Sequence, residues 1–370
     1  MSQPVLILSP LEDLNAATLE ACLGVLGVEA VRTPSLDHPR LRPLAFGWEA
    51  GEGWQAEAGA LPGGFASVWC RRPRRPVPPA GLQACDREFV ADEWGFFQEN
   101  LLEAGPDLFG GLWVNPPARA REAEQKLRQL RAAAASGLGI PPTLATCDPG
   151  RVRSFVAGQD QVIFKPFAPH TWRDGDGRLH NAVATLLDAD AVLEDPATSA
   201  AIALCPGLYQ RFVPKVADWR VTVIGDRCFP ARIRKRGGGA FVDWRPRTYM
   251  PDLLAEAADL PAEAEAGIRG VMARLGLVFG CVDLVETANG RLVFLEVNPG
   301  GQFMFVEELV PELPLVQAMA AMLAEGRTDY GLAGLPALPL QGCRDLPAYR
   351  AWRDACAPAA GPESWVVSQE

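Results

Sequence analysis

The spacing of apolar residues in the first part of the chain predicts a small lobe of strands and helices. The segment 5–9, which is apolar at its first four positions, is typical of a strand, and apolar residues then recur at helical spacing over 14–26. A short strand pattern follows at 28–32, another begins at 67, and a helical pattern covers 86–102. This order of elements predicts an α/β lobe.

The middle of the chain begins with a predicted helix over 118–136, which is rich in Ala, Arg and Glu. Gly137 suits the left-handed residue that ends a helix, and Asn-Pro-Pro at 115–117 predicts a domain boundary near 117. A Gly- and Asp-rich loop occupies 173–178. Strand patterns recur at 143–146, 161–167 and 208–213.

The last third of the chain is predicted to consist mainly of strands. Between 219 and 298 the pattern indicates three further strands, a helix at 261–275 and a hairpin. A helix around 313–325 follows, and the Pro-rich tail that comes after it has no clear pattern.

The hairpin brings two carboxylates together. Its strands are joined by Asn289-Gly290, the pair best suited to a two-residue turn, and that turn places Asp283 opposite Glu296. Like charges about 5 Å apart destabilise a sheet, and a bound cation would relieve this. Asn298 points to the same face, so three oxygen donors suited to Mg²⁺ would converge; the alternative is a solvent-exposed face. The other face is predicted to be apolar, with Val282, Leu284, Val293, Leu295 and Val297.

Composition narrows the possible functions. The 370 residues are 48% hydrophobic and 22% charged, which is typical of a globular chain of two or three domains rather than a disordered one. The formal net charge of -10 argues against a nucleic-acid binder that relies on general phosphate attraction. Only four of the 35 basic residues are lysines, at 126, 165, 215 and 235. A compact ammonium suits a phosphate, although chance explains the asymmetry equally well.

The sequence also predicts where the protein is found. No apolar run is long enough to span a membrane, and no basic segment precedes the first strand, so we expect a soluble cytoplasmic protein without a signal peptide. The nine cysteines are widely spaced without a CxxC pair, and there are three histidines. We therefore expect neither a zinc site nor disulfides.

The end of the hairpin, LEVNPGGQF at 295–303, resembles the C-terminal domain of ATP-grasp ligases, which carries a metal-binding acid and an E-x-N motif on adjacent strands. Lys165 in VIFKPF resembles the phosphate-binding lysine of that family, and Lys126 resembles its earlier ATP-site lysine. YQRFVPK at 209–215 resembles the hinge whose backbone holds adenine. Neither GxxxxGK[ST] nor GxGxxG occurs, so a P-loop or Rossmann site has no support.

Within this superfamily the chain most resembles the microviridin-type maturases of ribosomally made peptides, which link side chains as ω-esters or ω-amides. IRKRGGG at 233–239 and the segment after about 330 depart from that pattern. The runs that match in order are SVWCRRP near 70, the 93–102 helix, WVNPP at 113–117, KLRQLRAAAASGLGIPPTLAT at 126–146, DWRVTVIGD at 218–226, VDWR at 242–245 and LEVNPGGQFMFVE at 295–307.

The resemblance implies a mixed α/β (α+β) protein with the ATP-grasp fold. It implies an N-terminal α/β pre-ATP-grasp domain at 1–117 and a small central ATP-grasp subdomain at 118–208. A C-terminal subdomain at 209–328 would bind ATP on an antiparallel sheet. The role of the tail at 329–370 is left open.

The resemblance also implies residue roles. ATP-grasp ligases convert a carboxylate to an acyl phosphate, so cations must neutralise the moving phosphate charge. Mg²⁺ is expected on Asp283, Glu296 and Asn298. The residues expected to bind ATP are Lys126, Lys165, Gln210, Arg211, Phe212, Val213, Lys215 and Asp218. A solvated surface position is the alternative for the first two lysines.

Arginines would complete the catalytic group. Arg220 and Arg232 follow the hinge on two strands and are expected to clamp the transferring phosphoryl group. Lys215 and Asp218 are rivals for the ribose, and Asp218 alternatively orients Arg220. The residues expected to recognise substrate, or to be structural, are Arg71, Arg72, Arg234, Lys235, Asp243 and Arg245. His170 and His180 flank the 173–178 loop, which could close over the phosphates; both are interpreted as structural.

The resulting expectation is a ligase that uses ATP and Mg²⁺ to crosslink acidic side chains of a precursor peptide to Lys, Ser or Thr. Its partner would be an acidic peptide with a leader segment, and neither nucleic acid nor membrane is expected. One alternative is a ligase that adds free amino acids to a protein or small acid, as ribosomal-protein glutamate ligases do. Another is a non-catalytic nucleotide-binding protein. The bond type, the ring number and the oligomeric state, including a homodimer, stay open.

Overall fold

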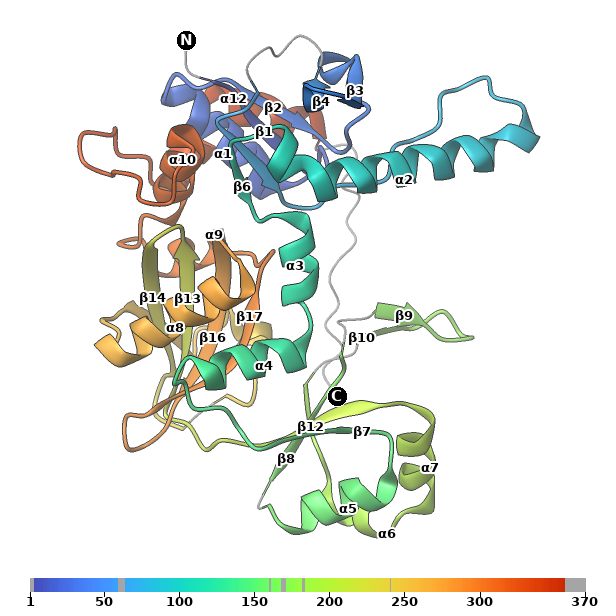
Figure 1. The fold of residues 1–370 in the computed structure, drawn as a ribbon. Coiled ribbons are helices and arrows are strands. Elements are labelled where there is room, and N and C mark those ends of the chain that lie inside the picture. The colour runs from blue at the N-terminus through green and yellow to red at the C-terminus, as the bar shows by residue number, and fades with distance from the viewer. Residues whose placement is uncertain are drawn as a thin grey trace.

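The computed structural model describes residues 3–58, 64–159, 161–167, 171–181, 184–239 and 241–356. Figure 1 shows an N-terminal lobe at the top, a five-stranded sheet with its helices in the middle and a small central lobe at the bottom. Among these residues no helix combines the length and the apolar character needed to cross a bilayer.

The N-terminal lobe is built on a parallel sheet with the strand order β2-β1-β5-β6. The predicted strands and helices of this lobe are confirmed with shifted ends. Asp13 begins α1 by accepting a hydrogen bond from the Ala16 N–H (2.9 Å). The first half of α2 projects from the lobe (Figure 1). The elements are β1 (Val5–Leu8), α1 (Leu14–Val25), β2 (Ala30–Thr33), the 3-10 turn Pro39–Leu41, β3 (Leu44–Glu49), β4 (Gly53–Ala58), β5 (Ser67–Cys70), α2 (Ala84–Leu108) and β6 (Leu112–Val114).

The prediction of one helix over 118–136 is wrong. The chain forms α3 (Pro117–Ala123) and α4 (Lys126–Ala135), and Gln125 between them is extended, with ψ 106°. The buried Gln129 side chain donates a hydrogen bond to the carbonyl of the last residue of α3 (2.7 Å) and so stabilises the break. Neither Gly nor Pro marks this break, so helix propensity alone could not predict it.

The central lobe contains an antiparallel sheet with the strand order β11-β8-β12-β7. The three predicted strands are confirmed, and three helices that were not predicted pack against the sheet. A separate hairpin, β9–β10, carries the predicted loop at 173–178 and projects from the lobe (Figure 1). The elements are β7 (Thr143–Thr146), α5 (Pro149–Ala157), β8 (Val162–Lys165), β9 (Thr171–Arg173), β10 (Leu179–Asn181), β11 (Thr185–Leu186), α6 (Ala189–Glu194), α7 (Pro196–Leu204) and β12 (Gly207–Arg211).

The five-stranded sheet is antiparallel throughout, with the strand order β15-β14-β13-β16-β17. The middle strand, β13, is buried along its whole length. Helices α4 and α8 cover one face, where Trp219, Leu284 and Phe294 join their core. The elements are β13 (Ala217–Ile224), β14 (Arg227–Lys235), the 3-10 turn Arg245–Arg247, β15 (Leu253–Ala257), α8 (Ala262–Leu275), β16 (Phe279–Glu286) and β17 (Leu292–Asn298).

The predicted pairing of Asp283 with Glu296 is confirmed, although the turn that predicted it is different. The loop has three residues rather than two, because Glu286 pairs with Leu292 and the Thr287 N–H donates to the Arg291 carbonyl. A bulge at Leu295 then restores the expected pairing. Leu295 itself lines a cleft on the charged face, so its predicted place on the apolar face is wrong.

The C-terminal segment packs against the N-terminal lobe. Its elements are α9 (Met304–Leu309), α10 (Leu315–Glu325), α11 (Leu340–Arg344) and α12 (Pro347–Cys356). Helix α10 shares a core with α1, and Tyr349 of the tail packs on α1 as well. The expectation of no disulfide is wrong, because Cys22 and Cys343 form one with Cα atoms 5.9 Å apart. The predicted divisions at 117, 208 and 328 stay predictions.

Candidate active site

A cleft between the central lobe and the five-stranded sheet contains most of the residues that the sequence singled out. We call it the inner cleft; its cavity volume is about 70 Å³. Strands β8 and β12 supply residues on one side and β16 and β17 on the other. The predicted residues that line it are Lys165, Gln210, Arg211, Phe212, Val213, Lys215, Asp218, Asp243, Arg245, Asp283 and Glu296.

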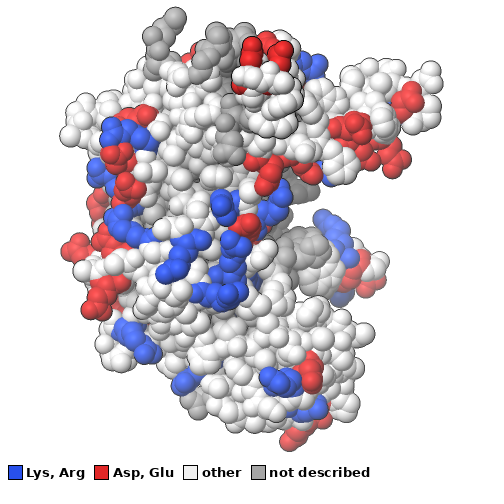
Figure 2. Space-filling view, in the orientation of Figure 1, with Lys and Arg blue, Asp and Glu red and all other residues white. Residues whose placement is uncertain are grey.

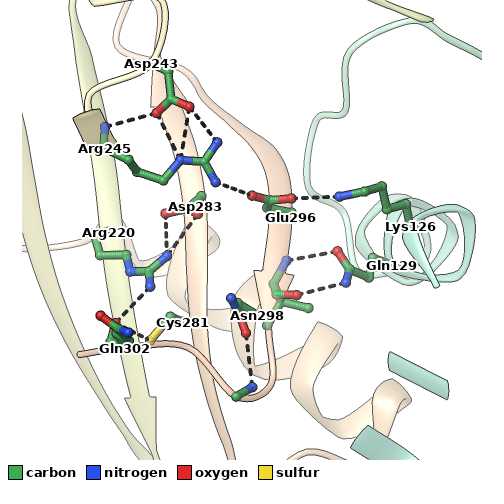
Figure 3. Close-up of polar contacts among 12 residues, drawn as sticks. Lys126, Gln129, Arg220, Asp243, Arg245, Cys281, Asp283, Glu296, Asn298 and Gln302 are labelled. Atoms are coloured by element: carbon green, nitrogen blue, oxygen red, sulfur yellow. Dashed lines mark hydrogen bonds and ion pairs between the residues drawn. The ribbon is translucent and has the colours of Figure 1, made fainter. Parts of the chain in front are cut away.

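Asp283 is paired with an arginine from the neighbouring strand (Figure 3). Nη1 of Arg220 donates to both oxygens of Asp283, at 3.0 and 2.9 Å. The side chains of Arg220 and Asp283 are only 7% and 11% exposed. Burial raises the pKa of Asp283, although Arg220 opposes this shift. The repulsion predicted between the two carboxylates is thus relieved by side-chain cations.

Glu296 lies between two further cations (Figure 3). Lys126 Nζ donates to one carboxylate oxygen and Arg245 Nη1 to the other, each at 3.2 Å. Burial favours the neutral acid, but Lys126, Arg245 and Lys165 outweigh it and hold the pKa of Glu296 at about 2. Figure 2 shows Lys and Arg side chains gathered over the middle of the molecule. This positive surrounding suits a phosphate group.

Gln129, which the sequence reasoning missed, holds β17 between two predicted metal ligands. Its Nε2 donates to the Val297 carbonyl at 2.8 Å, and its Oε1 accepts from the Val297 N–H at 3.0 Å (Figure 3). Asn298 lies just beyond, where its Oδ1 accepts from the Gly300 N–H at 3.1 Å. The position of Gln129 one helical turn after Lys126 is the signal that could have identified it.

A second buried amide was also missed. Nδ2 of Asn115 donates to the carbonyls of Phe279 and Pro299 at 2.8 and 2.9 Å. Its Oδ1 accepts from the N–H groups of Val278 and Phe279, at 2.8 and 2.9 Å. Asn115 therefore fixes the start of β16 and the end of β17 to the N-terminal lobe.

Asp243 and Arg245 come from the loop between β14 and β15. The Arg245 guanidinium donates to Asp243 at 2.9, 3.1 and 2.7 Å, while half of its side chain stays exposed. Burial opposes the charge on Asp243, but Arg245 lowers its pKa below the usual value. Arg245 is thus held by Asp243 as well as by Glu296, at the border of the inner cleft.

Lys215 and Asp218, the two residues predicted to compete for the ribose, bind each other in a buried ion pair. Lys215 Nζ donates to Asp218 at 2.6 Å and to the Val242 carbonyl at 3.2 Å. Burial raises the pKa of Asp218 to about 6 in spite of Lys215. Burial likewise lowers the pKa of Lys165, and Glu296 opposes that shift.

The prediction that Arg232 lies with Arg220 at a phosphoryl clamp is wrong. Arg232 pairs across the sheet with Trp219, so its side chain lies on the opposite face from that of Arg220. It donates to Glu286 at 2.7 Å and belongs to an ion-pair network outside the inner cleft.

Two other predicted substrate contacts also lie outside the inner cleft. Arg234 is bound to Glu256 at 2.9 Å. Lys235 lies 5.9 Å from the centre of the Phe241 ring. Neither residue lines the inner cleft or the two hollows that continue it.

Two hollows continue the inner cleft toward the N-terminal lobe. The middle hollow shares Arg245, Asp283 and Glu296 with the inner cleft and also contains Arg220 and Asn298. The outer hollow lies beside the start of α1 and contains Arg71. The residues common to the middle and outer hollows are Arg72, Tyr249, Gln302 and Phe305. The three spaces therefore form a continuous path.

The donor set fits a hard divalent cation. Asp283 and Glu296 face each other on paired strands, and Asn298 pairs with Cys281 on the same two strands. Carboxylate and amide oxygens beside lysines and arginines are what a magnesium-bound phosphate requires. No group of three His, Cys, Asp or Glu side chains suited to a metal occurs in the described ranges.

His180, near the predicted loop, stands apart from this site. His180 on β10 bonds to Asp174 at 2.8 Å and stacks on Trp172, with ring centres 5.4 Å apart. His170 lies outside the described residues.

No protein-family model and no curated protein matches the chain. Its structure is similar to that of a RiPP-associated ATP-grasp ligase from Chryseobacterium gregarium in complex with ADP and a leader and core peptide (TM-score 0.73, 20% identity, 88% of this chain and 97% of that one). It is also similar to the macrocyclase MdnC of Microcystis aeruginosa bound to the precursor peptide MdnA (TM-score 0.67, 22% identity, 86% of this chain and 98% of that one). A third similar structure is the macrocyclase MdnB of the same organism (TM-score 0.62, 24% identity, 87% of this chain and 99% of that one). The chain therefore has the ATP-grasp fold, as expected.

Proposed function

We propose that the chain is an ATP-dependent ligase that activates a carboxylate as an acyl phosphate and joins it to an amine or hydroxyl group. The observation that carries this proposal is the inner cleft. This cleft brings together the hinge at 210–215, Lys165 and the facing carboxylates Asp283 and Glu296. These residues come from segments far apart in the sequence. The chemistry is balanced: the carboxylate takes the terminal phosphoryl group of ATP, ADP leaves, and the acceptor then displaces inorganic phosphate.

In this proposal Asp283, Glu296 and Asn298 hold Mg²⁺, which would neutralise phosphate charge during transfer. Lys165 binds the phosphates from within the inner cleft, and Lys126 binds them from its position beside Glu296. The hinge from Gln210 to Lys215, which includes Arg211, Phe212 and Val213, holds the base and sugar together with Asp218. Asp283 fixes the guanidinium of Arg220, whose Nη2 donates to the Gln302 carbonyl (3.0 Å). Arg220 therefore reaches the middle hollow in a fixed orientation.

The substrate class is proposed from the solved structures of similar fold, which hold a leader and core peptide or a precursor peptide. We propose an acidic precursor peptide with a leader, crosslinked in the cytoplasm through side-chain esters or amides. The path of three hollows runs from the inner cleft to the start of α1, which supports a peptide over a small acid. The oligomeric state, including a possible homodimer, is left to be measured.

The test is incubation of the full chain with ATP, Mg²⁺ and an acidic peptide encoded beside it. The expected product is lighter by one water per crosslink, with one ADP formed for each. A product heavier by an added amino acid would replace this function with that of an amino-acid ligase. ADP release that does not depend on any acceptor would exclude both ligase functions.

A further inference from the structure

The outer hollow contains two guanidinium groups with unused hydrogen-bond donors. Arg71 is buried, with 1% of its side chain exposed, and its Nε donates to Asp13 at 2.9 Å. Its Nη2 has no partner in the part of the chain that the structure describes. Arg72 beside it makes no side-chain hydrogen bond or ion pair with the described residues. A buried donor without a partner is costly, so this arrangement favours an added anion.

The acidic side chains around the outer hollow are already engaged. Asp13 caps α1 in addition to binding Arg71. Glu12 pairs with Arg74, and Glu308 pairs with Arg344. These carboxylates therefore leave the exposed Arg72 free to meet an anion, beside the buried and unpaired Nη2 of Arg71.

The start of α1 adds to the positive potential. Leu14 and Asn15, the first residues of this 12-residue helix, line the outer hollow. N–H groups in the first turn of a helix have no intrahelical acceptor and favour an anion. Backbone and side-chain donors thus lie around the same space.

We propose that Arg71 and Arg72 form a carboxylate-binding site that holds an acidic side chain of the substrate outside the reacting centre. A planar guanidinium suits the paired oxygens of a carboxylate. Arg72 also lines the middle hollow, so a residue held there lies on the path to Asp283 and Glu296. The peptide identity of the ligand rests on the proposed function, whereas the site itself rests on these contacts.

The test measures binding of two fluorescent peptides of alternating Gly with Glu or with Gln to the full chain. The Glu peptide should bind more tightly, and Arg72→Gln should weaken it about tenfold, the usual effect of losing a hydrogen bond to a charged group. Arg74→Gln is the matched control, because Arg74 lines the same hollow but is paired with Glu12. Equal binding of both peptides, or an equal loss in the control, would overturn the site.

Arg71→Lys supplies a second variant, since it keeps a cation beside Asp13 but removes the unused Nη2. It should also weaken binding of the Glu peptide, provided that circular dichroism shows a folded protein; if it fails to fold, Arg72→Gln decides.

Competition with free L-glutamate shows whether an amino acid binds the same site. Binding of an ATP analogue to the unaltered chain separates the two proposals. Peptide binding that depends on Arg72, in a chain that does not bind nucleotide, would support the carboxylate site and contradict the ligase function. Nucleotide binding without a preference for the Glu peptide would support the ligase function and contradict the carboxylate site.

Discussion

The two faces of the five-stranded sheet use neighbouring residues of the same strands in opposite ways. Trp219 and Leu284 face α4 and α8 and are buried in an apolar core. Arg220 and Asp283, each one residue away, face the cleft and neutralise each other. The apolar face gains stability from packing, whereas the charged face can be stable only while each charge has a partner. Substitutions should therefore affect the two faces differently.

The largest loss of stability is expected on the apolar face. Phe294 is fully buried between the sheet and its helices, so Phe294→Ala should lower the free energy of unfolding by about 3–5 kcal/mol. Urea denaturation of this variant and the unaltered chain measures the difference. Leu295→Ala is the control, since Leu295 is half-buried at the cleft and should cost less. An equal loss at both positions would contradict the comparison.

The next effect distinguishes the two facing carboxylates. Asp283→Asn leaves the buried Arg220 without its counter-charge and should cost about 3 kcal/mol of stability. Glu296→Gln should cost less, because the side chain of its partner Arg245 is half exposed to water and Lys126 is partly exposed. Both variants should lose ADP release. Denaturant midpoints and ADP assays on the same samples test this; equal midpoints would show that burial of the pair is unimportant.

Asp218 should make stability depend on pH. Its pKa is about 6 in the folded chain, above the ordinary value of 3.8, so the folded state binds more protons between these values. Stability should then fall as pH rises from about 4 to 6, by at most about 3 kcal/mol. Asp218→Asn should remove this slope. Denaturation at several pH values with an unchanged slope in the variant would assign the dependence to another group.

The smallest effect is expected at Arg232, which lies on the helix-covered side. Arg232→Gln breaks partly exposed ion pairs with Glu286 and Glu256, so it should cost less than about 1 kcal/mol. ADP release should be unchanged, in contrast to Arg220→Gln. A large loss of turnover in Arg232→Gln with a folded protein would mean that the clamp uses both strands.

Local sequence patterns predicted the positions of the strands around the site well. They predicted less well which face of the sheet each side chain occupies. The pairing of Asp283 with Glu296 was correct because a longer turn and the bulge at Leu295 compensate each other. Neither the longer turn nor the bulge is marked by a distinct local sequence pattern. Arg232 was misplaced because only the pairing between β13 and β14 shows that it shares a face with Trp219.

Other parts of the site depend on contacts between distant segments. Gln129 and Asn115 bind backbone groups more than 160 residues away, which no local pattern reveals. The break between α3 and α4 likewise depends on the Gln129 side chain rather than on helix propensity. The motifs LEVNPGGQF and YQRFVPK each place several residues in the inner cleft or the middle hollow from one short run.

We expect the face carrying Asp283 and Glu296 to bind nucleotide phosphates through Mg²⁺. The most direct measurement is calorimetric titration of a non-hydrolysable ATP analogue with Mg²⁺ and with EDTA, on the unaltered chain and on Glu296→Gln. Binding should depend on Mg²⁺ in the unaltered chain. This dependence should be lost in the folded variant. The same affinity and the same dependence on Mg²⁺ in both proteins would contradict this expectation.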